Sequence, residues 1–230
     1  MGKIGVSGSG SDTPEPRPVL TKLRFLGFWA ACAFFAAGCA STEPLSKADR
    51  ARVRKVAIDP VVAVPKEVRY MGTTEAMGYG FGLMGAIVGQ MAREDGTASL
   101  ERMMEDRGIN VDAIVHDAFC ERLRKSKSFT LAQNPGADGQ IKLKVAKYGL
   151  FVAPWGFQRL KPIITLNGTL TDSAGRVIWE DQGKVNDNDA VVRGASLAEY
   201  MADPEMYRCD LRAVSVLAAD RLAAKLEGLH

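Results

Sequence analysis

Residues 164–179 read ITLNGTLTDSAGRVIW, and this stretch decides the fold. From Ile164 to Leu170, apolar residues and glycine alternate with threonine and asparagine, which is the period of a strand with one buried face. Asp172–Gly175 is a turn sequence, and Arg176–Trp179 begins a return strand. One buried face and one solvated face are typical of an antiparallel sheet. The stretch therefore predicts a β-hairpin.

Further periodic segments lie on both sides of this hairpin. Residues 55–59 and 141–145 have the composition and alternation of strands. Apolar residues recur at helical spacing over 111–123 and 207–226, and a shorter helix is expected over 97–108. These elements predict an α+β fold, in which a small antiparallel or mixed sheet carries amphipathic helices on one face.

The N-terminal region has the pattern of an export signal. Two basic residues precede the uncharged run 25–37, whose length suits a signal helix and is short for a membrane span. Small residues then precede Cys39, and this pattern resembles the lipobox of bacterial lipoproteins, although Ala36 stands where the family usually has leucine. The resemblance implies cleavage before Cys39 and its modification with lipid, palmitate included. The alternatives are a plain secretory signal and an uncleaved anchor.

These features divide the chain into three parts. Residues 1–38 are expected to form an N-terminal extension and lipoprotein signal peptide, and residues 39–54 a polar tether. Residues 55–230 are expected to form a periplasmic α+β domain. The net charge of +3, with most basic residues next to acidic ones, does not favour a nucleic-acid partner.

The tether bears on the membrane in two ways. Ala40 and Ser41 follow Cys39 without the aspartate that marks inner-membrane retention, so the resemblance implies the outer membrane. The basic residues from Arg50 to Lys55 are interpreted as a solvated part of the tether. Their contact with anionic lipid heads is the alternative.

A glycine-rich apolar insertion over residues 76–92 is the most unusual stretch of the domain. Gly78 and Gly82 are four residues apart, as are Gly85 and Gly89, so each pair would share one helix face. Small residues at this spacing let helices approach closely, which predicts a contact with the membrane or with other subunits. A flexible apolar loop and a crowded core helix are the alternatives.

Four cysteines are present, and two of them belong to the export signal. Cys32 would leave with the signal peptide, and Cys39 would carry lipid. Cys120 and Cys209 remain as an even pair in an oxidising compartment, where a disulfide between them is one interpretation. Two buried free thiols are the other, because free cysteine behaves as a small apolar residue.

Motifs for catalysis and cofactor binding are weak in this sequence. Residues 80–85 fit GxGxxG, but no clear strand precedes them, as a dinucleotide site would require. His116 lies off the apolar stripe of its helix and is interpreted as solvated, and the adjacent acids point in different directions. We therefore predict no enzyme, no metal and no cofactor.

The order of lipobox, strand, helix, strand, hairpin and C-terminal helix is similar to that of several envelope proteins. They include the curli-secretion (CsgG) lipoproteins, the amino-terminal domain of TolB and auxiliary lipoproteins of transport systems. The most specific local match is Leu170–Trp179, which resembles their recurring hairpin. Residues 76–92 resemble the glycine-rich segment of the TraT surface-exclusion lipoproteins, although it sits elsewhere in their chain order.

These resemblances imply a scaffolding or transport-accessory role. We therefore expect an outer-membrane lipoprotein that is a structural or accessory component of an envelope assembly, with protein partners or a homo-oligomer. The alternative is a monomeric periplasmic accessory lipoprotein that binds a ligand or a partner for a transport system.

Overall fold

Three long antiparallel strands dominate the computed structural model, and the expected hairpin joins the last two. They are β4 (Gly139–Val152), β5 (Leu160–Asp172) and β6 (Val177–Val185). The structure describes residues 44–72, 95–133, 135–152 and 159–229, which belong to one unit, Ser41–His230. Ile164, Leu166 and Leu170 of β5 are fully buried, as the predicted alternation requires. On the opposite face Asn167 and Thr169 are partly buried and Thr165 is buried, so the predicted solvated face is only partly exposed along this central strand.

Shorter strands complete a mixed six-stranded sheet. They are β1 (Lys55–Ile58), β2 (Arg69–Met71) and β3 (Thr130–Leu131). The order is β3-β1-β4-β5-β6, with β2 also paired to β4. β1 pairs with β3 and β4 in parallel, and β2 pairs with β4 in parallel. The prediction of an α+β fold with a small antiparallel or mixed sheet is confirmed, in its mixed form.

A β-bulge interrupts the pairing of β4 with β5. The register shifts between Val145 and Lys147, so Ala146 is an extra residue in β4. Before the bulge, Ile141, Leu143 and Val145 are buried, and after it the buried side chains are those of Tyr148 and Leu150. Because side chains alternate along a strand, one extra residue exchanges the two faces for everything that follows it.

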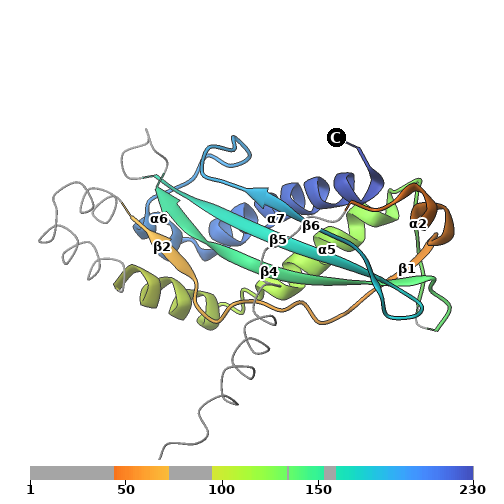
Figure 1. Ribbon diagram of the computed structural model, residues 1–230. Coiled ribbons are helices and arrows are strands. Elements are labelled where there is room, and N and C mark those ends of the chain that lie inside the picture. The colour runs from red at the N-terminus through yellow and green to blue at the C-terminus, as the bar shows by residue number, and fades with distance from the viewer. Residues whose placement is uncertain (1–43, 73–94, 134, 153–158, 230) are drawn as a thin grey trace, which may run out of the picture. The chain divides into compact units, whose positions relative to one another are not determined.

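Helices cover one face of this sheet. They are α5 (Val111–Arg124) and α7 (Pro204–Glu227), with the shorter α2 (Lys47–Arg52) and α6 (Leu197–Ala202). Residues 95–106 form a further helix. Figure 1 shows α5 and α7 side by side on the same side of β4, β5 and β6. Both helices were predicted, and each buries the apolar stripe that the sequence showed.

Local signals fix both ends of α7. The carboxylate of Asp203 accepts a hydrogen bond from the backbone N–H of Met206, and Pro204 occupies the first turn, where no N–H is needed. Gly228 ends the helix with φ of 72°, a left-handed conformation that favours glycine. Gly183 in β6 allows α7 to approach closely, because a Cβ atom there would collide with the carbonyl group of Ala218.

The stretch expected to be a tether departs from that expectation over its described part. Ser46 caps α2 within it, and the side chains of Leu45 and Val53 are buried in the domain core. The sequence did not predict that this segment is folded, because it is polar apart from the two apolar side chains that anchor it. The folded domain therefore begins before Lys55, and the tether between Cys39 and this domain is shorter than 39–54. The signal helix expected before it lies outside the described residues.

Candidate functional site

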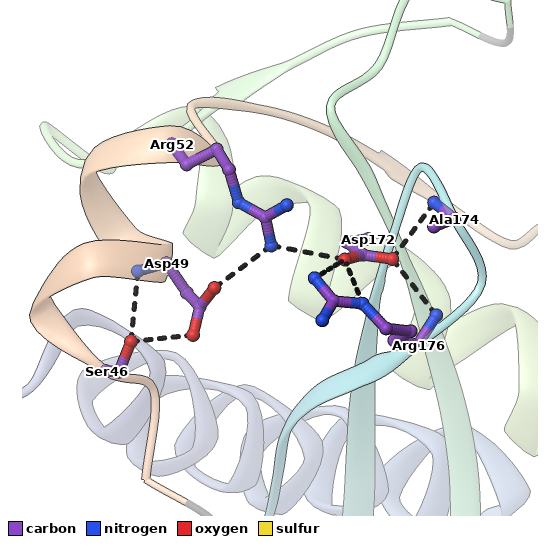
Figure 2. A network of polar contacts seen from close by, with 6 residues as sticks. All are labelled: Ser46, Asp49, Arg52, Asp172, Ala174 and Arg176. Carbon is purple, nitrogen blue, oxygen red and sulfur yellow. Dashed lines mark hydrogen bonds and ion pairs between the residues drawn. The ribbon is translucent and has the colours of Figure 1, made fainter.

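Asp172 forms the centre of a polar network at the tip of the β5–β6 hairpin (Figure 2). Its Oδ1 accepts hydrogen bonds from the backbone N–H groups of Ala174 and Arg176, each at a donor–acceptor distance of 3.0 Å. Its Oδ2 accepts from the Arg176 guanidinium at 2.8 and 3.0 Å and from Arg52 Nη2 at 3.1 Å. The carboxylate is only 1% exposed, so these bonds replace its hydration.

The second half of the network lies on α2. Ser46 caps this helix by accepting from the backbone N–H of Asp49 at 3.0 Å, and its hydroxyl donates to the Asp49 carboxylate at 2.6 Å. Asp49 also accepts from Arg52 at 3.0 Å. Figure 2 shows the Arg52 guanidinium between Asp49 and Asp172, so one side chain joins α2 to the hairpin.

Two further contacts hold α2 against the domain. The Arg50 guanidinium lies against Gly228, where any side chain would collide with it. Val53 packs against Gly139 at the start of β4. Figure 1 accordingly places α2 at the same end of the sheet as the hairpin and the end of α7. We call this end, formed by residues 45–53, 172–176 and 228, the α2 junction.

The electrostatics of the α2 junction are those of a structural clamp. The hydrogen bonds from Arg176 and Arg52 lower the pKa of Asp172 to about 2. The hydroxyl of Ser46 and the guanidinium of Arg52 lower the pKa of Asp49. Both carboxylates are therefore charged at neutral pH, and both are already paired with arginine side chains. This arrangement stabilises a position of α2, and it does not resemble a general acid or base poised near pH 7.

The residues predicted from the sequence as a lipidation and contact site have no described geometry. Cys39, Gly78, Gly82, Gly85 and Gly89 all lie outside the described residues. Their roles stay predictions. The α2 junction, which sequence reasoning missed, begins six residues after Cys39 with the buried Leu45.

Cys120 and Cys209 are both free thiols in the structure, which therefore does not contain the disulfide between them. Cys120 is buried on α5, but Cys209 is exposed, so the alternative of two buried thiols fits only Cys120. The physical reason is that Cys209 falls between Tyr207 and Leu211, off the buried stripe of α7. Burial raises the pKa of Cys120.

His116 lies one turn before Cys120. Its ring nitrogens lie 3.7 and 3.8 Å from the Cys120 sulfur, and Nδ1 lies 3.6 Å from the Asp117 carboxylate. The imidazole is about a quarter exposed. It is therefore in partial contact with solvent, as expected, and also covers the Cys120 thiol. Across the described ranges, no three histidine, cysteine, aspartate or glutamate side chains are grouped as a metal site would require.

A groove of about 750 Å³ lies over α5 and α7. Val191, Val216 and Leu229 give it an exposed apolar lining. At its edge, Arg122 of α5 binds Glu227 and Asp220 of α7, with shortest distances of 2.7 Å to each. These ion pairs link the two helices, and the apolar lining offers a surface for a ligand or partner. None of the described helices is both long enough and apolar enough to cross a membrane.

Comparison with known proteins gives remote likenesses. No family model and no curated protein matches the chain. Among solved structures, a Xanthomonas campestris protein of the DUF330 family is 10% identical with a TM-score of 0.41, covering 76% of this chain and 85% of that one. PelC from Paraburkholderia phytofirmans, solved as a dodecamer, is 12% identical with a TM-score of 0.33, covering 81% and 92%.

A lipoprotein from Neisseria meningitidis is also similar, at 15% identity and a TM-score of 0.25, with 68% of this chain and 98% of that one covered. The chain is thus similar to bacterial proteins that include a lipoprotein. At these identities and scores the likenesses carry no argument about function or assembly. The specific resemblances to CsgG, TolB and TraT stay predictions.

Proposed function

We propose that this chain is an outer-membrane lipoprotein, anchored through Cys39, that serves as a non-enzymatic structural or accessory component of an envelope assembly. The sequence around Cys39 supports the anchor. The domain supports a structural role, because its charge networks at the α2 junction and between α5 and α7 hold elements together. Asp172 clamps α2, and Arg122 joins α5 to α7. The absence of catalysis is part of the proposal.

The short connection between Cys39 and the domain carries this proposal. Leu45 is 5% exposed and belongs to the hydrophobic core, six residues after Cys39. A fully extended chain spans at most about 3.6 Å per residue, so Leu45 lies within about 22 Å of a lipidated Cys39. Because α2 is clamped to the hairpin, the domain would be held at the membrane surface and would not reach far into the periplasm.

The anchor is tested by a Cys39→Ser substitution in the full chain. The variant should lose incorporation of labelled palmitate and should leave the outer-membrane fraction or remain uncleaved. Cys209→Ser is the matched control, because this exposed thiol is far from the signal in the sequence and its loss should leave both properties unchanged. A Cys39→Ser protein that is still cleaved and still labelled would refute the lipobox interpretation.

The assembly is tested by the native mass of the lipidated protein, extracted from membranes in a mild detergent. A discrete mass of many protomers would support an assembly, and replacing Gly82 and Gly85 with leucine should then reduce it while far-UV circular dichroism stays unchanged. A protomer-sized particle in the wild-type protein would contradict a homo-oligomer.

A second candidate function is a monomeric accessory lipoprotein that binds a ligand or partner. The groove over α5 and α7 favours it, because Val216 and Leu229 are 48% and 61% exposed there. A Val216→Glu substitution should then abolish co-purification of one defined partner without changing the native mass. If the substitution leaves every co-purifying protein in place, the groove is not the binding surface.

A further inference from the structure

The face of the sheet opposite α5 and α7 carries a group of lysines, Lys142, Lys144, Lys147 and Lys184, and we call it the lysine face. Residues that pair across the strands share a face, and Lys147 pairs with Thr165, which pairs with Lys184. In the next row, Lys144 pairs with Asn167, which pairs with Gln182. Lys142, Thr169 and Glu180 form a third row. Successive rows lie about 7 Å apart, because each residue of a strand advances about 3.4 Å.

The bulge in β4 brings Lys147 onto the lysine face. Lys142 and Lys144 alternate with the buried residues before the bulge, and both are exposed. Lys147 would face the helices if the alternation continued, because it is an odd number of residues from Lys144. The extra residue Ala146 reverses the alternation, so Lys147 joins the other two on the open face.

The charge of this face is predominantly positive. Arg69 of β2 pairs with Gly149 two residues beyond Lys147, which places it on the same face. Burial, together with the positive charges of Arg69 and Lys184, lowers the pKa of Lys147. Its ammonium group lies 4.2 Å from the centre of the Phe151 ring, which holds the side chain over the sheet. The acids that oppose this charge are Glu180 in the third row and Asp187 near Lys147.

We propose that this lysine face binds an anionic polysaccharide, a hydroxylated chain with carboxylate or phosphate groups, laid along β4, β5 and β6. The lysines of the three rows would contact the acidic groups as separate point charges. Between them, Thr169 and Gln182 offer hydroxyl and amide groups that can exchange hydrogen bonds with sugar hydroxyls, whereas the Oδ1 atom of Asn167 is buried. The repeat of lysines along β4 suits a polymer whose charges recur along its length.

A glycan fits this face better than other anionic partners. Protein interfaces are enriched in aromatic, Met and Arg side chains and depleted in lysine. The three rows themselves contain no large hydrophobic side chain. The nearest on this face are Phe151, which lies beneath Lys147, and Val177, which pairs with Thr171 in the adjoining row, so a protein would find few apolar anchors there. Peripheral helices bind bilayers by inserting apolar side chains, which these rows likewise do not offer. Of these exclusions, only that of nucleic acid depends on the proposed envelope location.

The test measures binding of the full chain, purified in a mild detergent, to polygalacturonate, with neutral dextran as the polymer control. Lys144→Gln and Lys184→Gln should each weaken binding about fivefold, the size of effect that one lysine has at an anionic surface. The double variant should weaken it about 25-fold if the two sites act independently. Lys127→Gln removes the same charge on the helical side of the domain and should have no effect.

Three results would overturn the inference. Equal loss in Lys127→Gln would show attraction by net charge alone. Tighter binding to polyglutamate than to polygalacturonate would identify an acidic protein segment as the occupant. Binding to vesicles of anionic phospholipid, weakened by the same variants and without polygalacturonate binding, would identify a membrane. This assay does not depend on Cys39, so it can fail while the anchor experiment succeeds, and the reverse.

Discussion

Arg52 of α2 donates a hydrogen bond of 3.1 Å to Asp172 at the β5–β6 hairpin, although 120 residues separate the two in the sequence. This pair joins the first described helix of the chain to the central hairpin of the sheet. Asp172 is held at the same time by Arg176 and by two backbone N–H groups of its own turn. The hairpin tip therefore presents a fixed carboxylate, and α2 docks onto it.

Removal of this charge should release α2. In Asp172→Asn, Arg52 keeps Asp49 within α2 but loses its anionic partner on the hairpin, so amide hydrogen exchange should accelerate in residues 47–53 while α5 stays protected. Arg52→Gln should have the same effect, because Arg52 makes the contact from α2. Arg176→Gln is the matched control, since Arg176 holds Asp172 from within the hairpin. If exchange in α2 is unchanged in Arg52→Gln, the clamp is not what positions this helix.

The α2 junction should resist acid. The pKa of Asp172 is lowered to about 2 from 3.8, so this group stabilises the fold above pH 3.8 and its contribution disappears as the pH falls through 2. The backbone amide resonances of Ala174 and Arg176 should therefore keep their shifts down to about pH 3 and change below it. A transition near pH 4 would mean that the carboxylate is not held as described.

The close approach of α7 to β6 should make Gly183 intolerant of any side chain. A Cβ atom at this position would collide with the carbonyl group of Ala218, so Gly183→Ala forces the helix away from the sheet. Overpacking of this kind costs about 1–3 kcal/mol, measured here as a lower urea midpoint. Gln182→Ala, exposed on the other face of the same strand, should change the midpoint far less.

Two tyrosines in edge-to-face contact should respond differently to loss of their hydroxyl groups. Tyr200 and Tyr207 meet edge to face at 5.5 Å. The Tyr200 hydroxyl donates to the Asp210 carboxylate at 2.7 Å, whereas that of Tyr207 has the Met104 sulfur at 3.7 Å. Tyr200→Phe should therefore lower the free energy of unfolding by about 1.5–3 kcal/mol, as expected for a bond to a charged group. Tyr207→Phe should cost less than about 1 kcal/mol, because sulfur is a weak acceptor.

The two free cysteines of the domain should differ in reactivity. Cys209 is exposed and should react with a thiol reagent in the native protein. Cys120 is buried with a raised pKa, so it should react only on unfolding. Two reactive thiols in denaturant without reductant would agree with the structure, whereas none would show that the two are bonded in the mature protein.

The sequence was most informative where the signal is local. The hairpin at residues 164–179 combines an alternating pattern with a turn sequence, and both α5 and α7 carry an apolar stripe. Each of these signals lies within a few residues, so each element could be predicted with its position. The parallel pairing of β1 with β4 could not, because no local pattern states which distant strand is the neighbour.

The α2 junction was missed for the same reason. Residues 47–52 read KADRAR, a polar sequence that is typical of a solvated tether. What makes it part of the domain is a carboxylate 120 residues away and a glycine at the end of α7. The lysine face was also missed, because it depends on a one-residue bulge that alternation alone does not reveal.

The contact between Arg50 and Gly228 has a practical consequence for any reporter joined to this chain. The two ends of the described domain meet there, so a fluorescent protein or affinity tag placed after Leu229 would emerge beside α2. With a lipidated Cys39, such a tag would compete with the bilayer for the same space. A label in the exposed loop at Asn188 would leave that space free, and a comparison of the two would show whether poor yield comes from the protein or from its tag.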